Sequence, residues 1–352
     1  MMKMKKAAFL ILALAMVLTL GARGGNSGQQ STTTPPPSGS GETYTLSYAS
    51  NNAPGSDRYD LLEQVFANLM HEKSNGRITV ELYPSGSLSA PGKTLDGIKN
   101  GTVDTGIDSF TRYSGQYPYF ELLTTPAHVF GTPEEFNQVL VDFVKAFPDA
   151  EAKYYKIIVL CDAGDFGLVS TTPLKTVEDI KGKSVRNTAN FIPLLNLLGA
   201  SSVSLPSSEM YEALKLNTIN ASNTTDQAIP EFHLEEVCNY FTRLAVERSD
   251  FMIVMNLDLY NGFDDELKAA VDAVCEEMKQ VSLNYLYANN EHSRAKIKEN
   301  AKFEYVTMDD AEVKKLVDIA KPLLETKAAE LDAAGLDGTG ALKWLRARYS
   351  LR

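Results

Sequence analysis

Cysteine is scarce in this sequence of 352 residues, which contains only Cys161, Cys238 and Cys275. The three thiols are odd in number and far apart, so they provide neither a disulfide framework nor the close spacing of a metal site. We therefore expect each cysteine to pack as a small apolar residue, and we expect no metal site.

Histidine is equally rare, and no grouping of reactive side chains indicates catalysis. His71, His128, His233 and His292 are scattered, and none has another histidine or a cysteine at ligand spacing. The triplet at 165–167 matches a kinase motif, but the glycine-rich loop and the catalytic loop of a kinase are missing. The sequence therefore predicts a protein that is not an enzyme and has no cofactor. A hydrolase or lyase is the less favoured alternative, because no paired acid and base can be placed.

Basic runs are missing beyond the first six residues, and the formal net charge is -11. An acidic field repels nucleic acid and anionic membrane surfaces unless a basic patch compensates for it. After the N-terminal segment, no apolar run approaches the length of about 20 residues that spans a membrane. We therefore expect no nucleic-acid partner and a mature chain that is soluble.

The N-terminus has the features of an export signal. Lysines among the first six residues precede an apolar run from Ala7 to Leu20. This order of a charged region and a short hydrophobic region is typical of a secretory signal. We predict that residues 1–22 are a signal peptide. The mature protein would then lie in the periplasm or on the outer face of the cytoplasmic membrane.

Residues 23–42 have the composition of a disordered linker, since they are almost entirely Gly, Ser, Thr, Gln, Asn and Pro. In exported bacterial proteins such a linker usually follows a lipid-modified cysteine, and Leu20-Gly21-Ala22 is the kind of segment that precedes this cysteine. Arg23 stands in the place of the cysteine. An arginine has no thiol to accept a lipid, so we expect no lipid anchor at this position.

The rest of the chain alternates strand-like and helix-like patterns. Apolar residues alternate at 44–48 and 78–82, and between these segments they follow helical spacing at 61–70. A second unit of this kind begins with a β-branched run at 157–160, and the absence of Gly and Pro from 264 to 321 predicts a long helix. The length and this alternation predict an α/β fold of two domains with largely parallel sheets.

Arg186 is the residue that most strongly suggests a binding site. It ends a predicted strand at 184–186, and open α/β sheets present ligand-binding groups at the carboxyl ends of their strands. The planar guanidinium can donate two parallel hydrogen bonds to a carboxylate. From the residues alone, a ligand carboxylate and an internal salt bridge explain Arg186 equally well.

Five segments, in order, carry a resemblance to a known family. The segments are FANLMHEKSNGRITVELYPSGSL at 66–88, IKNGTVDTGI at 98–107, PLKTVEDIKGKSVR at 173–186, LLGASSVSLPSSEMYEALKLNTINAS at 197–222 and EEVCNYF at 235–241. Together they resemble the solute-binding subunits of tripartite ATP-independent periplasmic (TRAP) transporters, of the dicarboxylate-binding (DctP) type. The resemblance extends from about Tyr44 to Leu331.

The resemblance implies a two-lobed periplasmic-binding-protein-like fold with hinge strands and a long helix spanning both lobes. Lobe I would comprise residues 43–163 plus 252–290, and lobe II residues 164–251 plus 291–352. The implied function is extracytoplasmic capture of a small carboxylate-bearing organic acid in the cleft between the lobes. The protein, expected to be a monomer, would deliver the acid to a TRAP-type membrane permease. A ligand sensor for a membrane receptor is the alternative.

The resemblance also places residues at the ligand, and the family's carboxylate-binding arginine falls on Arg186. We expect Asn52, Ser109 and Phe110 to line the cleft from lobe I, and Phe166, Asn187, Ser207, Thr224 and Asp226 to line it from lobe II.

Three positions depart from the family pattern. Thr224 stands in the place of a ligand-contacting asparagine, Ser207 in that of an aromatic residue, and Gly167 in that of the second arginine of sialic-acid-type members. These departures favour a monoacid over sialic acid or a dicarboxylate held at both ends.

Overall fold

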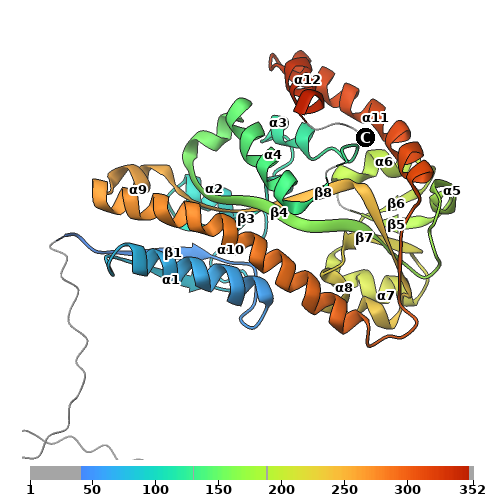
Figure 1. The fold of residues 1–352 in the computed structure, drawn as a ribbon, viewed down its shortest axis with the longest axis horizontal. Helices are drawn as coiled ribbons and strands as arrows, with labels where there is room; N and C mark the ends of the chain where they lie inside the picture. The colour runs from blue at the N-terminus through green and yellow to red at the C-terminus, as the bar shows by residue number, and fades with distance from the viewer. Residues whose placement is uncertain (1–40, 130, 188, 349–352) are drawn as a thin grey trace, which may run out of the picture. The chain divides into compact units, whose positions relative to one another are not determined.

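The structure is a computed structural model that describes residues 41–129, 131–187 and 189–348 (Figure 1). The predicted signal peptide, Arg23 and the linker up to residue 40 lie outside the described residues. Within this part, strands and helices alternate along the chain, which confirms the α/β class predicted from the sequence.

One sheet runs through the described part of the chain, in the order β2-β1-β3-β8-β4-β7-β5-β6, with β9 paired to β8. The sheet is mixed. Strands β1, β2 and β3 are parallel to one another, as are β5, β6 and β7, whereas β4 and β8 are antiparallel to each other. The bounds are β1 Tyr44–Ala49, β2 Ile78–Tyr83, β3 Thr105–Asp108, β4 Tyr155–Ser170, β5 Ser184–Arg186, β6 Ser201–Val203, β7 Ala221–Thr225, β8 Tyr240–Asn256 and β9 Glu304–Val306.

Strands β4 and β8 join the two halves of the sheet. They are 16 and 17 residues long, and the far end of β8 pairs with β3 while the end of β4 pairs with β7. Their mutual register shifts near Ile157, Asp162 and Asp165. Such irregularities bend a strand and increase its twist, so these two strands have the geometry expected of hinge strands.

The helices cover both faces of the sheet, and the long helix α10 passes β4 on its way from α1 to α8 (Figure 1). The bounds are α1 Gln64–Lys73, α2 Thr94–Lys99, α3 Pro118–Leu123, α4 Pro133–Ala146, α5 Val177–Ile180, α6 Ile192–Leu197, α7 Met210–Lys215, α8 Ala228–Glu231, α9 Leu257–Gly262, α10 Asp265–Ile297, α11 Asp310–Ala333 and α12 Gly338–Arg348.

Helix α10 has 33 residues, which corresponds to a length of roughly 50 Å. Its first turn is capped by Asp264, whose carboxylate accepts a hydrogen bond from the Leu267 amide at 2.9 Å. An apolar stripe that includes Leu267, Val271 and Met278 is buried against the first half of the sheet. The far end of the helix reaches the second half, where Ile297 belongs to the same buried cluster as Met210 of α7.

The cysteines pack as the sequence predicts. Cys161 and Cys238 are buried, Cys275 is half-buried, and all three are free thiols. Burial raises the pKa of the Cys238 thiol to about 12, so it is inert as a nucleophile at neutral pH.

Candidate functional site

Arg186 lies at the carboxyl end of β5 and pairs with Ser222 of the neighbouring parallel strand β7, which continues to Thr225. Its guanidinium is held by three neutral oxygens of the protein. Nε donates to the Leu205 carbonyl at 3.1 Å, Nη1 to the Asn223 carbonyl at 3.3 Å and Nη2 to the Ser207 hydroxyl at 3.0 Å. These bonds fix the orientation of the guanidinium. Because all three acceptors are neutral, they leave its positive charge uncompensated.

The charge of Arg186 has no acidic partner, since none of the described carboxylates forms an ion pair with it. Burial lowers the pKa of this guanidinium from its ordinary value, because partial removal from water disfavours the charged form. A half-buried cation without a counter-charge favours binding of an anion. Of the two interpretations that the sequence leaves open, this geometry supports the ligand carboxylate.

Two other predicted residues lie on the same part of the sheet as Arg186. Ser207, just before α7, is bonded directly to it. Thr224 lies on β7, two residues after Ser222, which pairs with Arg186 in the register of β5 and β7. Paired residues, and residues two apart along a strand, point to the same face of a sheet, so Thr224 shares a face with Arg186.

The remaining lobe II residues have other surroundings. Asn187 is buried, and its Nδ2 donates to the Ser202 hydroxyl at 2.7 Å. Phe166 pairs with Thr225, one position from Thr224, which places it on the opposite face of the sheet by alternation. Asp226 is buried at the end of β7 and accepts a hydrogen bond from Nε of Arg294 at 3.4 Å.

The lobe I residues form two separate groups. The Ser109 hydroxyl and the Phe110 amide donate to the two oxygens of Asp250, at 2.8 and 3.0 Å. The Phe110 ring is only 2% exposed and lies in the core. Nδ2 of Asn52 donates to Glu63 Oε1 at 2.5 Å. The structure shows no hydrogen bond or ion pair between these residues and the described part of lobe II around Arg186.

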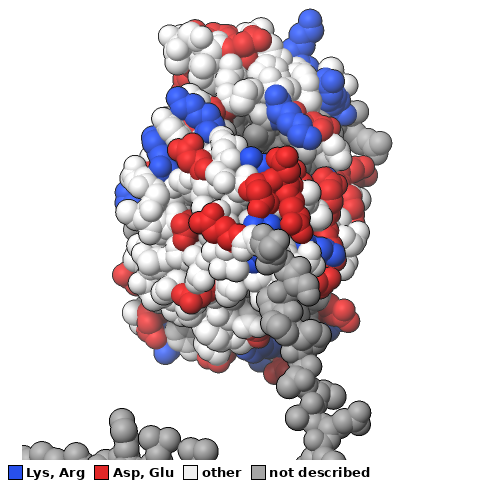
Figure 2. Space-filling view, turned by 90° about the vertical axis from the view of Figure 1, so that its left-hand side faces the viewer, with Lys and Arg blue, Asp and Glu red and all other residues white. Residues whose placement is uncertain are grey.

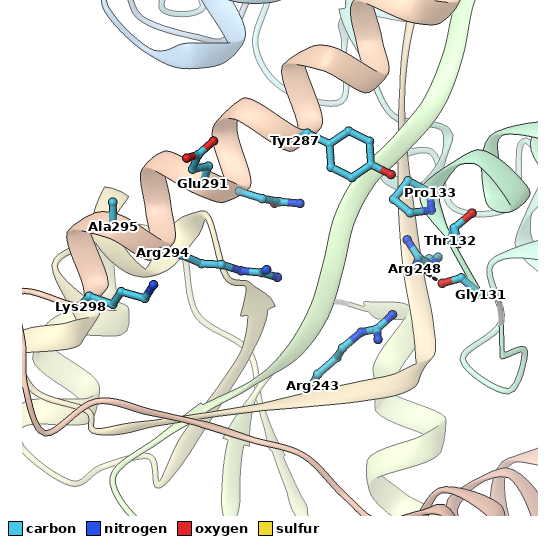
Figure 3. Close-up of a pocket in the computed structure, with 11 residues that line it drawn as sticks. Gly131, Thr132, Pro133, Arg243, Arg248, Tyr287, Glu291, Arg294, Ala295 and Lys298 are labelled. Atoms are coloured by element: carbon cyan, nitrogen blue, oxygen red, sulfur yellow. Dashed lines mark hydrogen bonds between the residues drawn. The ribbon is translucent and has the colours of Figure 1, made fainter.

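The structure also contains a cavity of about 770 Å³ that sequence reasoning missed (Figure 3). Its walls come from the loop before α4, from β8 and from the last turns of α10, which are far apart in the sequence. The one available signal was the occurrence of two arginines, Arg243 and Arg248, in the same strand β8. The lining residues are Gly131, Thr132, Pro133, Arg243, Arg248, Tyr287, Asn290, Glu291, Arg294, Ala295 and Lys298.

The cavity gathers basic side chains in a chain whose net charge is -11. By contrast, the face of the molecule in Figure 2 carries a broad group of acidic side chains near its centre. Arg248 is buried, forms an ion pair with Asp162 and donates to the Gly131 carbonyl at 3.1 Å. Arg294 contacts Asp226, and its guanidinium lies 5.7 Å from the centre of the Tyr305 ring.

Glu247 of β8 is a buried carboxyl group beside the hinge. It accepts a hydrogen bond from Asn223 Nδ2 at 2.7 Å, but burial outweighs this contact and raises its pKa from 4.5 to about 8. Burial raises the pKa of Glu63 to about 7 and that of Asp250 to about 6. The folded protein therefore holds protons on these groups at pH values where the unfolded chain releases them.

These pKa values predict that stability falls as the pH rises from about 4.5 to about 8, because the folded state binds more protons than the unfolded state over this range. Glu247→Gln stays neutral and can still accept the bond from Asn223. We expect it to leave the free energy of unfolding unchanged at pH 4.5 and to raise it at pH 8 by at least about 1.4 kcal/mol, the equivalent of one pKa unit. Urea unfolding at both pH values measures this. Glu299→Gln, at an exposed site, is the control, and equal pH slopes for the parent and Glu247→Gln would contradict the prediction.

Among the described residues, no group of three or more His, Cys, Asp or Glu side chains could hold a metal ion. None of the described helices combines the length and the apolar character that a membrane span requires.

Sequence relatives of this chain include several binding proteins. The 2,3-diketo-L-gulonate-binding periplasmic protein YiaO of Escherichia coli is 24% identical over 63% of this chain and 69% of its own length. The C4-dicarboxylate-binding protein DctB of Bacillus subtilis is 21% identical over 70% of this chain and 72% of its own length.

Solved structures share the fold. A TRAP solute-binding protein from Rhodoferax ferrireducens, in complex with copurified benzoate, has a TM-score of 0.78 and 20% identity, covering 88% of this chain and 98% of that one. A marine metagenome TRAP solute-binding protein with bound 3-hydroxybenzoate also has a TM-score of 0.78 and 20% identity, covering 88% of this chain and 100% of that one. The two-lobed fold predicted from the sequence is thus confirmed.

The family model described as bacterial extracellular solute-binding protein, family 7 (DctP), matches residues 48–331. This match covers well over half of the chain and contains the hinge strands, α10 and Arg186. Members of this family are extracellular solute-binding proteins and not enzymes. The chain therefore belongs to the family 7 bacterial extracellular solute-binding proteins.

Proposed function

We propose that this protein captures a small organic acid outside the cytoplasm and delivers it to the membrane permease of a TRAP transporter. The observation that carries the proposal is Arg186. Its half-buried guanidinium is oriented by three neutral oxygens and forms no ion pair with a described carboxylate. A carboxylate of the ligand would supply the missing counter-charge and could accept two parallel hydrogen bonds.

The names of relatives and structural neighbours support the same class of ligand. They include proteins named for binding a diketo-gulonate or C4-dicarboxylates, and structures that hold benzoate or 3-hydroxybenzoate. These molecules differ in size and ring content but share a carboxylate. Arg186 is suited to that common group, and the rest of the site would then select among acids.

In this proposal the carboxylate sits at the ends of β5 and β7, beside Ser207 and Thr224. Asn52, Ser109 and Phe110 would form the facing wall when the lobes approach, with lobe I comprising 43–163 and 252–290 and lobe II comprising 164–251 and 291–352. Since the Phe110 ring is buried and its amide already donates to Asp250, Phe110 would support this wall from behind rather than contact a ligand directly. The protein would act as a monomer without lipidation at Arg23.

Mass spectrometry of small molecules released from the gently purified protein tests the proposal. We expect an organic acid at close to one molecule per chain. Arg186→Ala, purified in parallel, should retain much less of it. Retention of only neutral or cationic compounds would contradict the proposal, as would equal retention of the acid by both proteins.

A further inference from the structure

Helix α11 is in contact with helices of both lobes, and its first half is held by lobe II. Glu312 accepts a hydrogen bond from the Val177 amide at the start of α5, at 2.8 Å. Lys315 forms an ion pair with Glu178 of the same helix. These contacts tie the first two turns of α11 to the part of the chain expected to form lobe II.

The second half of α11 and the following helix α12 are attached to lobe I instead. Lys327 donates to Glu121 of α3 at 2.5 Å. The Trp344 ring of α12 packs against the Phe143 ring of α4, with the ring centres 5.7 Å apart. The expected lobe II segment at 291–352 is therefore divided, because its last part contacts helices of lobe I.

Both halves of α11 are also packed into the core. The buried stripe of the helix includes Leu316 and Ala320 before its midpoint and Leu324 after it. All three belong to one apolar cluster that also contains Phe120 of α3 and Leu194 of α6. Since neither half is free to detach, a movement of one lobe against the other has to be absorbed within the helix.

Pro322 stands between the two sets of contacts, inside the helix. A proline has no N–H to donate to the carbonyl four residues earlier, here that of Asp318, and its ring crowds that carbonyl. The Thr326 hydroxyl donates to the Pro322 carbonyl at 2.9 Å, and such a bond from a side chain to the preceding turn often bends a helix. Both features make this turn the easiest place for α11 to bend.

A cavity of about 250 Å³ lies beside the turn that follows Pro322. Leu323 and Thr326 line it from α11, Thr125 lines it from lobe I, and Pro193 of α6 lines it from lobe II. Close-packed interiors resist relative movement, whereas an unfilled space between two elements leaves them room to approach. The cavity provides this room where α11 passes from one lobe to the other.

We propose that α11 is a further connection between the lobes, in addition to the hinge strands and α10, and that it bends at Pro322 when the lobes move. The first half moves with lobe II, and the second half moves with α12 and lobe I. This connection concerns how the lobes are joined rather than what they bind, and so it goes beyond the proposed function.

Two pairs of spin labels on the full chain, read by pulsed electron spin resonance without any ligand, test the proposal. Lys314→Cys with Ala329→Cys reports the shape of α11, since both residues are exposed and lie on either side of the proline. Glu72→Cys on α1 with Glu212→Cys on α7 reports the separation of the lobes (Figure 1). The half-buried native thiol is removed in every protein by Cys275→Ser.

We expect a broad distance distribution for each pair in the parent protein, because α11 adopts forms that differ in bend. Pro322→Ala restores the missing amide donor, and alanine is the strongest helix former, so this variant favours a straight helix. Both distributions should become narrower, and the shorter distances of the α11 pair should be lost. Lys321→Ala, an exposed change in the same turn, is the control and should leave both distributions unchanged.

Three results would overturn the proposal. One is a single narrow distance for the α11 pair in the parent protein, which needs no variant. Another is persistence of both broad distributions in Pro322→Ala. The third is narrowing of the α11 pair alone, which would show a bend that is not coupled to the lobes. None of these measurements uses a ligand, so they do not bear on the capture of an organic acid, which the Arg186→Ala comparison tests separately.

Discussion

Replacing Arg186 by alanine should leave the fold intact and weaken binding of the organic acid by about 30-fold to several thousandfold. The range corresponds to about 2 to 5 kcal/mol, the usual effect of removing one partner of a desolvated charge pair. The effect is expected to be large because the oxygens that hold Arg186 are all neutral, so the substitution removes the positive charge that would pair with the carboxylate. Calorimetric titration with the acid identified by mass spectrometry measures the change.

Two further variants define what this result means. Arg186→Lys should recover little affinity, because an ammonium group cannot reproduce the planar fork that Leu205, Asn223 and Ser207 orient. Arg346→Ala, on α12, removes an arginine that forms an ion pair with Glu325. This variant should bind the acid with the affinity of the parent protein. An Arg186→Ala protein that is folded and binds with parental affinity would refute the assignment of this residue.

Replacing Arg248 by leucine should lower the free energy of unfolding by about 3 to 5 kcal/mol. The side chains of Arg248 and Asp162 are only 4% and 0% exposed, so the substitution leaves a buried carboxylate without its arginine. The pair also links β8 to β4 at the point where their register shifts, and Arg248 further holds the Gly131 carbonyl before α4. Urea unfolding followed by circular dichroism gives the change.

The double variant Arg248→Leu, Asp162→Asn provides the internal control. Neutralising the stranded carboxylate should restore a large part of the lost stability, because most of the penalty is due to the unpaired buried charge rather than to the lost contact. Arg346→Leu, which breaks a more exposed ion pair with Glu325, should lower the free energy of unfolding by no more than about 1 kcal/mol. If Arg248→Leu lowers the free energy of unfolding no more than Arg346→Leu does, the ion pair between Arg248 and Asp162 does not stabilise the hinge strands.

Local patterns in the sequence were enough to predict the fold class and the position of Arg186. The alternation of Tyr44, Leu46 and Tyr48 corresponds to β1, and the apolar stripe from Leu267 onward corresponds to α10. Each of these signals lies within a short segment, because the periodicity of a strand or helix reflects which face is buried. Arg186 could be located in the same way, since the end of a parallel strand is recognisable from its own neighbours in the chain.

The residues around Arg186 were harder to predict, because their roles depend on partners that are distant in the sequence. Phe110 was expected to line the cleft, yet its ring is buried among core aromatic residues such as Tyr117 and Phe120. Asp226 was expected near the ligand, and it accepts a hydrogen bond from Arg294 of α10. Nothing in the segments that contain these residues specifies such contacts.

The sequence by itself determined the α/β class and the family, and it singled out Arg186 as the candidate for binding a carboxylate, since all three inferences depend on local pattern and motif. Only the tertiary structure decided which charged side chains lie close together beside the hinge strands. The crossing of β8 and α10 brings Arg243, Arg248 and Arg294 to one cavity, and the register of four strands puts Arg243 on the face of Arg186. The physical reason is that strand pairing and helix crossing set distances between residues far apart in the chain, and single-segment periodicity carries no information about those distances.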